Sequence, residues 1–184
     1  MCRHWFRPPQ PLPTTKTLSN VLYNIFLSVG FPINSIKFAV AQALHETGNK
    51  IDQPHETNGK NWSGITYIGQ PTLQKNAKRG NLKPQKDWND PNKPEYYAWF
   101  DTVEDWARDF KRIISRSNGL KGRPIEATTL KEYATRLKAN YYFGDTVENY
   151  SKALTYWLDK IKATLPANNT AILIFIAIGI FYLL

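Results

Sequence analysis

Residues 38–49 read FAVAQALHETGN and form the second half of a predicted helix that carries a carboxylate near its end, at Glu46. Asn34 or Ser35 can cap the start of this helix, and Gly48 can take the left-handed conformation that closes a helix. A carboxylate in the last turn meets the negative end of the helix dipole, which raises its pKa. Such a carboxylate suits a general acid, although position alone more often means a solvated helix-end carboxylate.

Further amphipathic helices are predicted on both sides of this segment. Residues 18–29 carry an apolar stripe with helical spacing, and Gly30 followed by Phe31 and Pro32 ends that helix. Three later helices are each predicted to start at a threonine that can cap the first turn, namely Thr102, Thr129 and Thr146.

The region between the early and late helices has a different composition. Residues 52–94 have little periodicity and many Asn, Gly, Lys and Pro residues. They predict long loops with a short hairpin, whose extended arms are residues 65–68 and 96–100 and whose turn is residues 89–92. The predicted fold class is therefore α+β and mainly helical, with one domain at residues 17–165 and no internal repeat.

The two ends of the chain differ from this domain. Residues 1–16 contain four prolines between positions 8 and 13, which predicts an extended Pro-rich arm without a secretory signal peptide. Residues 171–184 are all uncharged and apolar or aromatic. As a helix they would span about 21 Å, against a bilayer hydrocarbon core of about 30 Å. Extended upstream, residues 167–184 predict a C-terminal transmembrane helix, with a buried strand or helix as the alternative.

Composition narrows the class of partner. The chain has 24 Lys and Arg against 15 Asp and Glu, a net charge of +9 that favours polyanions such as nucleic acid, anionic lipid or bacterial cell wall. No DNA-binding or RNA-binding motif is recognisable, and the aromatic residues fall on amphipathic stripes that suit a core, so no nucleic-acid partner is expected. Cys2 is the single cysteine, which excludes a disulfide within the chain.

Four segments resemble, in order, the landmarks of the glucosaminidase family, glycoside hydrolase family 73, within the lysozyme-like superfamily. They are residues 38–49 around Glu46, the run NWSGI at 61–65, the run WFDTVEDW at 99–106, and residues 137–150, which contain NYYFGD. The resemblance covers about residues 34–162. It implies a lysozyme-like domain with a small β-hairpin lobe, and a peptidoglycan-cleaving activity on the β-1,4-linked glycan.

Carried over residue by residue, the resemblance implies that Glu46 protonates the glycosidic oxygen and that Tyr142 helps to orient the reacting sugar, with Tyr141 as the alternative for that role. The residues that it implies for substrate binding are Gln42, Asn61, Trp62, Gly64, Ile65, Tyr141 and Tyr150. Trp62 would offer a ring face to a sugar at the cleft floor. Without the resemblance, Tyr and Trp are more often core residues than ligand contacts.

The sequence departs from the family pattern at the second carboxylate, which members often place in the hairpin. The candidates here are Asp87, Asp90 and Glu95, and none of them is a clear match. A second carboxylate could activate water for hydrolysis, whereas without one the acetamido group or the 6-hydroxyl of the substrate could attack, the latter being lytic transglycosylation. Muramidase action and a non-catalytic wall-binding or virion structural role stay open as alternatives.

A metal site is the remaining catalytic hypothesis, because His45-Glu46 and His55-Glu56 are two histidine-carboxylate pairs. A zinc-protease helix needs a second histidine four residues after the first, and that position is Asn49. We therefore expect no metal and no cofactor.

The residues before the apolar tail bear on location. Lys152, Lys160 and Lys162 favour a cytoplasmic position for the domain, where no cell wall exists. Together with the absence of an export signal, this topology suggests a phage protein that is anchored in the host cell membrane or in an internal membrane of the virion. The oligomeric state is left open.

Overall fold

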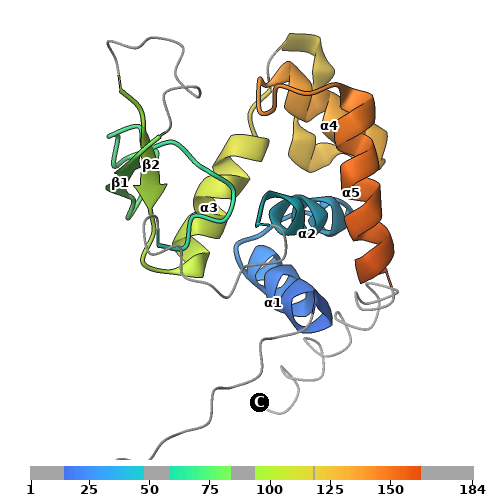
Figure 1. The fold of residues 1–184 in the computed structure, drawn as a ribbon, viewed down its shortest axis with the longest axis horizontal. Coiled ribbons are helices and arrows are strands. Elements are labelled where there is room, and N and C mark those ends of the chain that lie inside the picture. Colours follow the sequence, from blue (N-terminus) through green and yellow to red (C-terminus); the bar gives the residue numbers. More distant parts are fainter. Residues whose placement is uncertain (1–14, 48–58, 84–93, 118, 163–184) are drawn as a thin grey trace, which may run out of the picture.

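The computed structural model describes residues 15–47, 59–83, 94–117 and 119–162 (Figure 1). Within these ranges the chain is mainly helical α+β, as the sequence predicts. The helices are α1 (Thr15–Ser28), α2 (Ile33–Thr47), α3 (Val103–Ile114), α4 (Leu130–Ala139) and α5 (Val147–Ile161); the strands are β1 (Lys78–Leu82) and β2 (Tyr96–Trp99); two 3-10 turns are η2 (Gly119–Lys121) and η3 (Pro124–Glu126).

The predicted Pro-rich arm and the predicted membrane anchor lie outside the described residues, apart from the last residues of the arm, where α1 begins. In the described part of the chain, no helix is both long and apolar enough to cross a membrane.

The three predicted helix starts are confirmed. In each case a threonine hydroxyl accepts a hydrogen bond from the backbone N–H three residues later, which satisfies one of the free donors of the first turn. The pairs are Thr102 with Asp105 at 3.1 Å, Thr129 with Glu132 at 3.2 Å, and Thr146 with Asn149 at 3.2 Å. Each cap stabilises the fold by about 1 kcal/mol.

The end of α1 is also as predicted. Gly30 has a φ of +79°, and its N–H donates to the carbonyl of Leu27 at 2.9 Å, while the N–H of Phe31 donates to the carbonyl of Phe26 at 3.0 Å. This pair of bonds is a Schellman motif, which usually has glycine at the left-handed position. The turn that it makes leads directly into α2.

Helix α2 lies in the middle of the helical part, in contact with both α1 and α5 (Figure 1). Its central residues have no polar face, because nearly every side chain from Ser35 to Leu44 is buried. A helix that is buried all round is held in place by its neighbours rather than by its own amphipathicity. This arrangement fixes the direction in which the end of α2, and hence Glu46, points.

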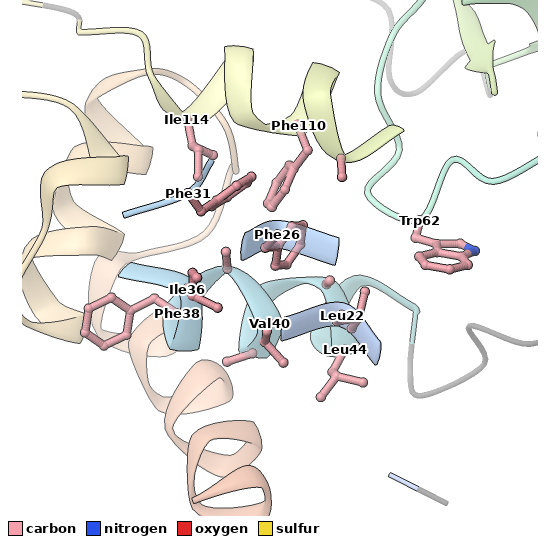
Figure 2. Packing of buried hydrophobic residues seen from close by; sticks show 14 of the residues in the cluster. Leu22, Phe26, Phe31, Ile36, Phe38, Val40, Leu44, Trp62, Phe110 and Ile114 are labelled. Carbon is pink, nitrogen blue, oxygen red and sulfur yellow. The ribbon is translucent and has the colours of Figure 1, made fainter. Parts of the chain in front are cut away.

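The aromatic core lies where α1, the turn after it and α3 meet (Figure 2). The rings of Phe26 and Phe31 are 4.5 Å apart, and Trp106 stacks on Phe110 at 5.5 Å. Full burial of a phenylalanine side chain contributes roughly 1.5–3 kcal/mol. This cluster fastens α3 to α1.

The small sheet is the two-stranded antiparallel pair of β1 and β2, with an irregular register in β1 between Arg79 and Leu82. Strand β2 confirms the predicted arm at residues 96–100. Strand β1 is not where the sequence placed the other arm, because its residues are polar and mostly exposed and show no alternation.

The other predicted arm, residues 65–68, lies on the opposite edge of β2. It joins that strand through an isolated bridge between Thr66 and Tyr97 and through a hydrogen bond from the N–H of Ala98 to the carbonyl of Ile65 at 2.8 Å. The arm is therefore extended and paired with β2, but it is not a regular strand. The predicted turn at residues 89–92 lies outside the described residues.

Candidate active site

A cleft of about 1080 Å³ lies between the segment before the hairpin and the ends of the helices. One side is formed by residues 63–66 and part of the hairpin, and the other by the ends of α2, α3 and α4 and the start of α5. Of the residues that the sequence predicted for the site, the cleft lining includes Glu46, Gly64, Ile65, Tyr141, Tyr142 and Tyr150.

Glu46 lies in the last turn of α2 and faces the cleft. The Tyr150 hydroxyl donates a hydrogen bond to its Oε1 at 2.9 Å. Glu46 is exposed to the cleft, but neighbouring protein atoms partly desolvate its carboxyl group, and this desolvation raises the pKa of Glu46. The bond from Tyr150 and the nearby His45 act in the opposite direction but more weakly. The site therefore favours a carboxyl group that keeps its proton to higher pH than an ordinary glutamate.

Tyr150 reaches Glu46 because the first turn of α5 packs against the end of α2. Its ring is buried, stacks on Phe143 with a centroid distance of 3.9 Å, and meets the His45 ring edge-on at 5.5 Å. Burial and the neighbouring Glu46 raise the pKa of Tyr150 far above its usual range, so its hydroxyl remains a donor. The tyrosine thus holds one carboxyl oxygen in a fixed direction.

Gln42 lies one turn before Glu46 but faces the interior instead of the cleft. It is fully buried, and the Tyr133 hydroxyl donates to its Oε1 at 2.5 Å. Its Nε2 lies near the Tyr142 hydroxyl without meeting hydrogen-bond geometry. The structure therefore places Gln42 behind the cleft wall, where it supports the tyrosines.

Tyr142 stands between this buried layer and the cleft. Its hydroxyl donates to the backbone carbonyl of Ser63 at 3.3 Å, which connects the loop after α4 to the opposite side of the cleft. Burial and the charge of Glu46 raise the pKa of Tyr142 well above its usual range. Its hydroxyl therefore stays protonated and lies within electrostatic reach of Glu46.

Asn61 shapes the floor without lining it. Its Nδ2 donates to the carbonyls of Ile65 and Ala98, each at 2.8 Å, and its Oδ1 accepts from the N–H of Ile65 at 2.9 Å. These bonds close the loop on itself and dock it on β2. They present Gly64, with a φ of +62°, and Ile65 to the cleft.

Trp62, which the resemblance placed at the cleft floor, is not among the lining residues. The structure places its ring in the core, 7% exposed and 5.1 Å from the ring of Trp106, and not on the cleft wall (Figure 2). The indole N–H of Trp106 donates to the Ser63 hydroxyl at 2.9 Å, so a hydrogen bond as well as ring packing joins this loop to α3. Residue type alone does not separate a core tryptophan from a sugar platform, and here packing decided for the core.

Tyr141 has the opposite character, since its side chain is 85% exposed and lines the cleft. Its φ is +57°, which places a bulky residue in the left-handed region. The N–H of Tyr141 donates to Lys138 at 3.0 Å and that of Tyr142 to Leu137 at 3.1 Å, so α4 ends in a Schellman motif with tyrosine where glycine is usual. A strained backbone thus supports an exposed ring at the site.

The candidates for a second carboxylate do not meet Glu46 in the described part of the structure. Asp87 and Asp90 lie outside the described residues. Glu95 pairs with Lys83 at 3.1 Å and does not line the cleft. Among the described lining residues, Glu46 is the one carboxylate.

Basic side chains on the cleft are what the sequence reasoning missed. The lining includes Lys83, Arg112, Arg116 and Lys138. Arg112 lies in the last turn of α3, and Arg116 lies four residues further along the chain, two residues beyond the end of that helix. That spacing was the available signal, but it did not show which side would face the cleft.

No metal site is formed by the described residues, since no group of three His, Cys, Asp or Glu side chains comes together there. His45 is on the cleft beside Glu46, and His55 lies outside the described residues.

Comparison with known proteins adds no assignment, because no model of a protein family, no curated sequence and no solved structure matches the chain.

Proposed function

We propose that this chain is a glycosidase with a lysozyme-like fold that cleaves the β-1,4-linked glycan of peptidoglycan, in the manner of an N-acetylglucosaminidase, with Glu46 as the general acid. One observation carries the proposal: Glu46 faces the cleft with a raised pKa and with one carboxyl oxygen held by Tyr150. A glycosidase acid needs this state, because it must hold a proton at the pH at which it works and release it to the leaving oxygen.

The geometry supports a simple division of roles. Tyr150 occupies Oε1 of Glu46, which leaves Oε2 to carry the proton that is transferred to the glycosidic oxygen. As the bond from C1 to that oxygen breaks, positive charge develops on the sugar ring. The exposed Tyr141 ring offers a face on which a sugar can stack, and Gly64 allows the glycan to approach the opposite wall closely.

The direct test is clearing of purified peptidoglycan by the full chain in detergent, with Glu46→Gln as the key variant. Gln keeps the shape and can still accept from Tyr150, but it has no proton of suitable acidity to transfer. Glu104→Gln is a matched control, because Glu104 is exposed on α3 and does not line the cleft. Clearing by Glu46→Gln at the wild-type rate would contradict the proposal and favour a non-catalytic wall-binding role.

The product end distinguishes the reaction classes on this cleft. Hydrolysis next to N-acetylglucosamine leaves a reducing N-acetylglucosamine end, which is the expected product, and muramidase action leaves a reducing N-acetylmuramic end. Lytic transglycosylation is the second candidate, favoured by the finding that Glu46 is the one carboxylate among the described lining residues. It would leave a 1,6-anhydro-muramic end, and mass spectrometry of the fragments separates all three.

The location is part of the proposal. The apolar residues 171–184 would attach the domain to a membrane, and a phage protein at the host membrane or inside the virion could reach the wall from there. Flotation of the full chain with lipid vesicles, and loss of flotation when these residues are removed, would test the attachment.

A further inference from the structure

The basic side of the cleft is not explained by acid catalysis. Arg112 and Arg116 both line it, at the C-terminal end of α3 and just beyond. Arg112 pairs through its Nε with Asp109, which is itself buried and also accepts from Gln74 at 2.8 Å. Two guanidinium groups are therefore placed near a single carboxylate, and one positive charge is left without a counterion among these groups.

The details of both arginines indicate a group prepared for an anion. The Nη1 of Arg112 is buried and has no hydrogen-bond partner, an uncommon and costly state for a donor. Burial and the positive charge of Arg112 lower the pKa of Arg116, and Asp109 only partly offsets them. An anion bound beside Arg116 would offset the repulsion between the two arginines.

A structural role at the end of α3 accounts for only part of the placement of Arg112 and Arg116. Cations near a helix C-terminus interact favourably with the helix dipole. Lys111, also in the last turn of α3, donates to the carbonyl of Val29 at the C-terminal end of α1 at 2.9 Å. The dipole favours cations at this helix end, but it does not account for the buried Nη1 donor of Arg112 without an acceptor.

The position of the pair relates it to Tyr141. The side-chain amide of Asn140 donates to the backbone carbonyl of Arg116 at 3.0 Å and ties the end of α4 to the end of α3. Tyr141 follows directly and presents its exposed ring to the same cleft. A sugar on that ring would lie in the same cleft as Arg116. In peptidoglycan, N-acetylmuramic acid carries a lactyl-linked peptide with carboxylates, whereas N-acetylglucosamine is neutral.

We propose that Arg112 and Arg116 form a carboxylate-binding subsite that takes the acidic peptide substituent of an N-acetylmuramic unit. This inference rests on the proposed peptidoglycan-cleaving function and specifies what that cleft recognises. It makes the substrate the peptide-bearing glycan, in preference to neutral polymers of N-acetylglucosamine. The planar guanidinium of Arg116 can bind a carboxylate through two parallel N–H groups.

The test measures binding by calorimetry with the full chain carrying Glu46→Gln, so that no ligand is cleaved. The ligands are a disaccharide-peptide with free carboxylates, the same molecule with its carboxylates amidated, and a neutral tetramer of N-acetylglucosamine. Adding Arg116→Gln is expected to weaken the first ligand about tenfold and to leave the other two unchanged. Arg116→Lys should recover part of the loss, because it keeps the charge but not the paired geometry.

Arg108→Gln is the matched control. Arg108 lies on the same helix and pairs with Asp105 at the same i,i+3 spacing as Arg112 with Asp109, but it does not line the cleft. It should leave binding of all three ligands unchanged. Equal affinity for the free and amidated ligands, or equal losses for both in Arg116→Gln, would overturn the subsite.

Failure of the subsite and failure of the proposed function give different results. If the wild-type chain clears wall but Arg116→Gln binds the acidic ligand normally, the subsite is wrong and the function stands. If wall is not cleared but carboxylate-dependent binding is lost in Arg116→Gln, the subsite stands and the function is wrong. If none of the three ligands binds, the subsite is wrong, and wall clearing alone decides the proposed function.

Discussion

The ends of α1 and α4 are built by the same backbone hydrogen bonds but with different residues. At the end of α1, Gly30 takes the left-handed position, and the turn leads into the core. At the end of α4 the same position is held by Tyr141, which is strained and exposed on the cleft. Where the motif leads into the core, it has glycine, which takes the left-handed conformation without strain. Where the motif borders the cleft, it has tyrosine, which this conformation disfavours.

The same contrast separates the core from the cleft more generally. Around Phe26 and Phe110, apolar side chains lie in a buried, apolar environment. On the cleft, Glu46 sits at the wrong end of a helix dipole and Arg112 has a buried donor without an acceptor. Departures from local rules gather at functional sites, because function and stability ask for different residues there.

The largest expected effect is on activity, from Glu46→Gln. Removing a general acid is expected to lower the rate of peptidoglycan clearing about 10²- to 10⁴-fold. The full chain is assayed by the fall in turbidity of a wall suspension, beside Glu104→Gln. Loss of clearing in the Glu104 variant as well would show that the assay reports charge or folding instead of the acid.

The same variant is expected to become more stable at neutral pH. The pKa of Glu46 is raised from 4.5, so between 4.5 and the raised value the folded chain binds more protons than the unfolded chain. The stability of the wild type therefore falls as pH rises through this window, and Gln at position 46 does not titrate. In urea unfolding, the free energy of unfolding of Glu46→Gln should exceed that of the wild type at pH 7, and the difference between them should shrink below pH 4.5. A difference that does not change with pH would mean that titration of Glu46 is not the cause.

On the core side, Phe26→Ala is expected to lower the free energy of unfolding by about 3–5 kcal/mol, because it leaves a cavity among Phe31, Trp106 and Phe110. Chemical unfolding measures the change. Activity per folded molecule should stay close to wild type at a temperature where the variant is folded. A loss of activity without a loss of stability would remove the distinction between core and cleft.

Tyr150→Phe should move the pH profile with a smaller effect on rate. The hydrogen bond from Tyr150 lowers the pKa of Glu46, so its removal should raise that pKa further. A general acid is lost as it deprotonates, and the alkaline limb of the clearing rate should therefore shift to higher pH. A shift to lower pH, or none, would show that the tyrosine does not act through this carboxyl group.

The smallest expected effects come from substitutions at the left-handed positions that end α1 and α4. Gly30→Ala should destabilise and Tyr141→Gly should stabilise, each by about 1 kcal/mol, because the left-handed conformation costs about that much for a residue with a Cβ. Tyr141→Gly should at the same time lower clearing, since the exposed ring is lost. Thermal unfolding beside the clearing assay measures both, and a destabilised Tyr141→Gly would mean that the ring contributes to packing.

The helices were predictable because the signals for them act over a few residues. Caps at Thr102, Thr129 and Thr146 and the stop at Gly30 depend on hydrogen bonds to residues within one turn. Strand β1 was missed because an exposed polar strand has no alternating pattern.

The resemblance of residues 38–49 marked Glu46 as the candidate acid, and local sequence was enough to place it at the end of a helix, since a helix, its end and the dipole at that end are properties of one segment. It was not enough for the partners of Glu46. Tyr150 meets the carboxyl group from 104 residues away because α5 packs on α2. Trp62 lies in the core and Arg116 lines the cleft because of contacts between segments that are far apart in the chain. Sequence by itself determined which segments become helices and which carboxylate ends one of them, whereas packing decided what surrounds that carboxylate, because burial and charge at a site are sums over segments distant in the chain.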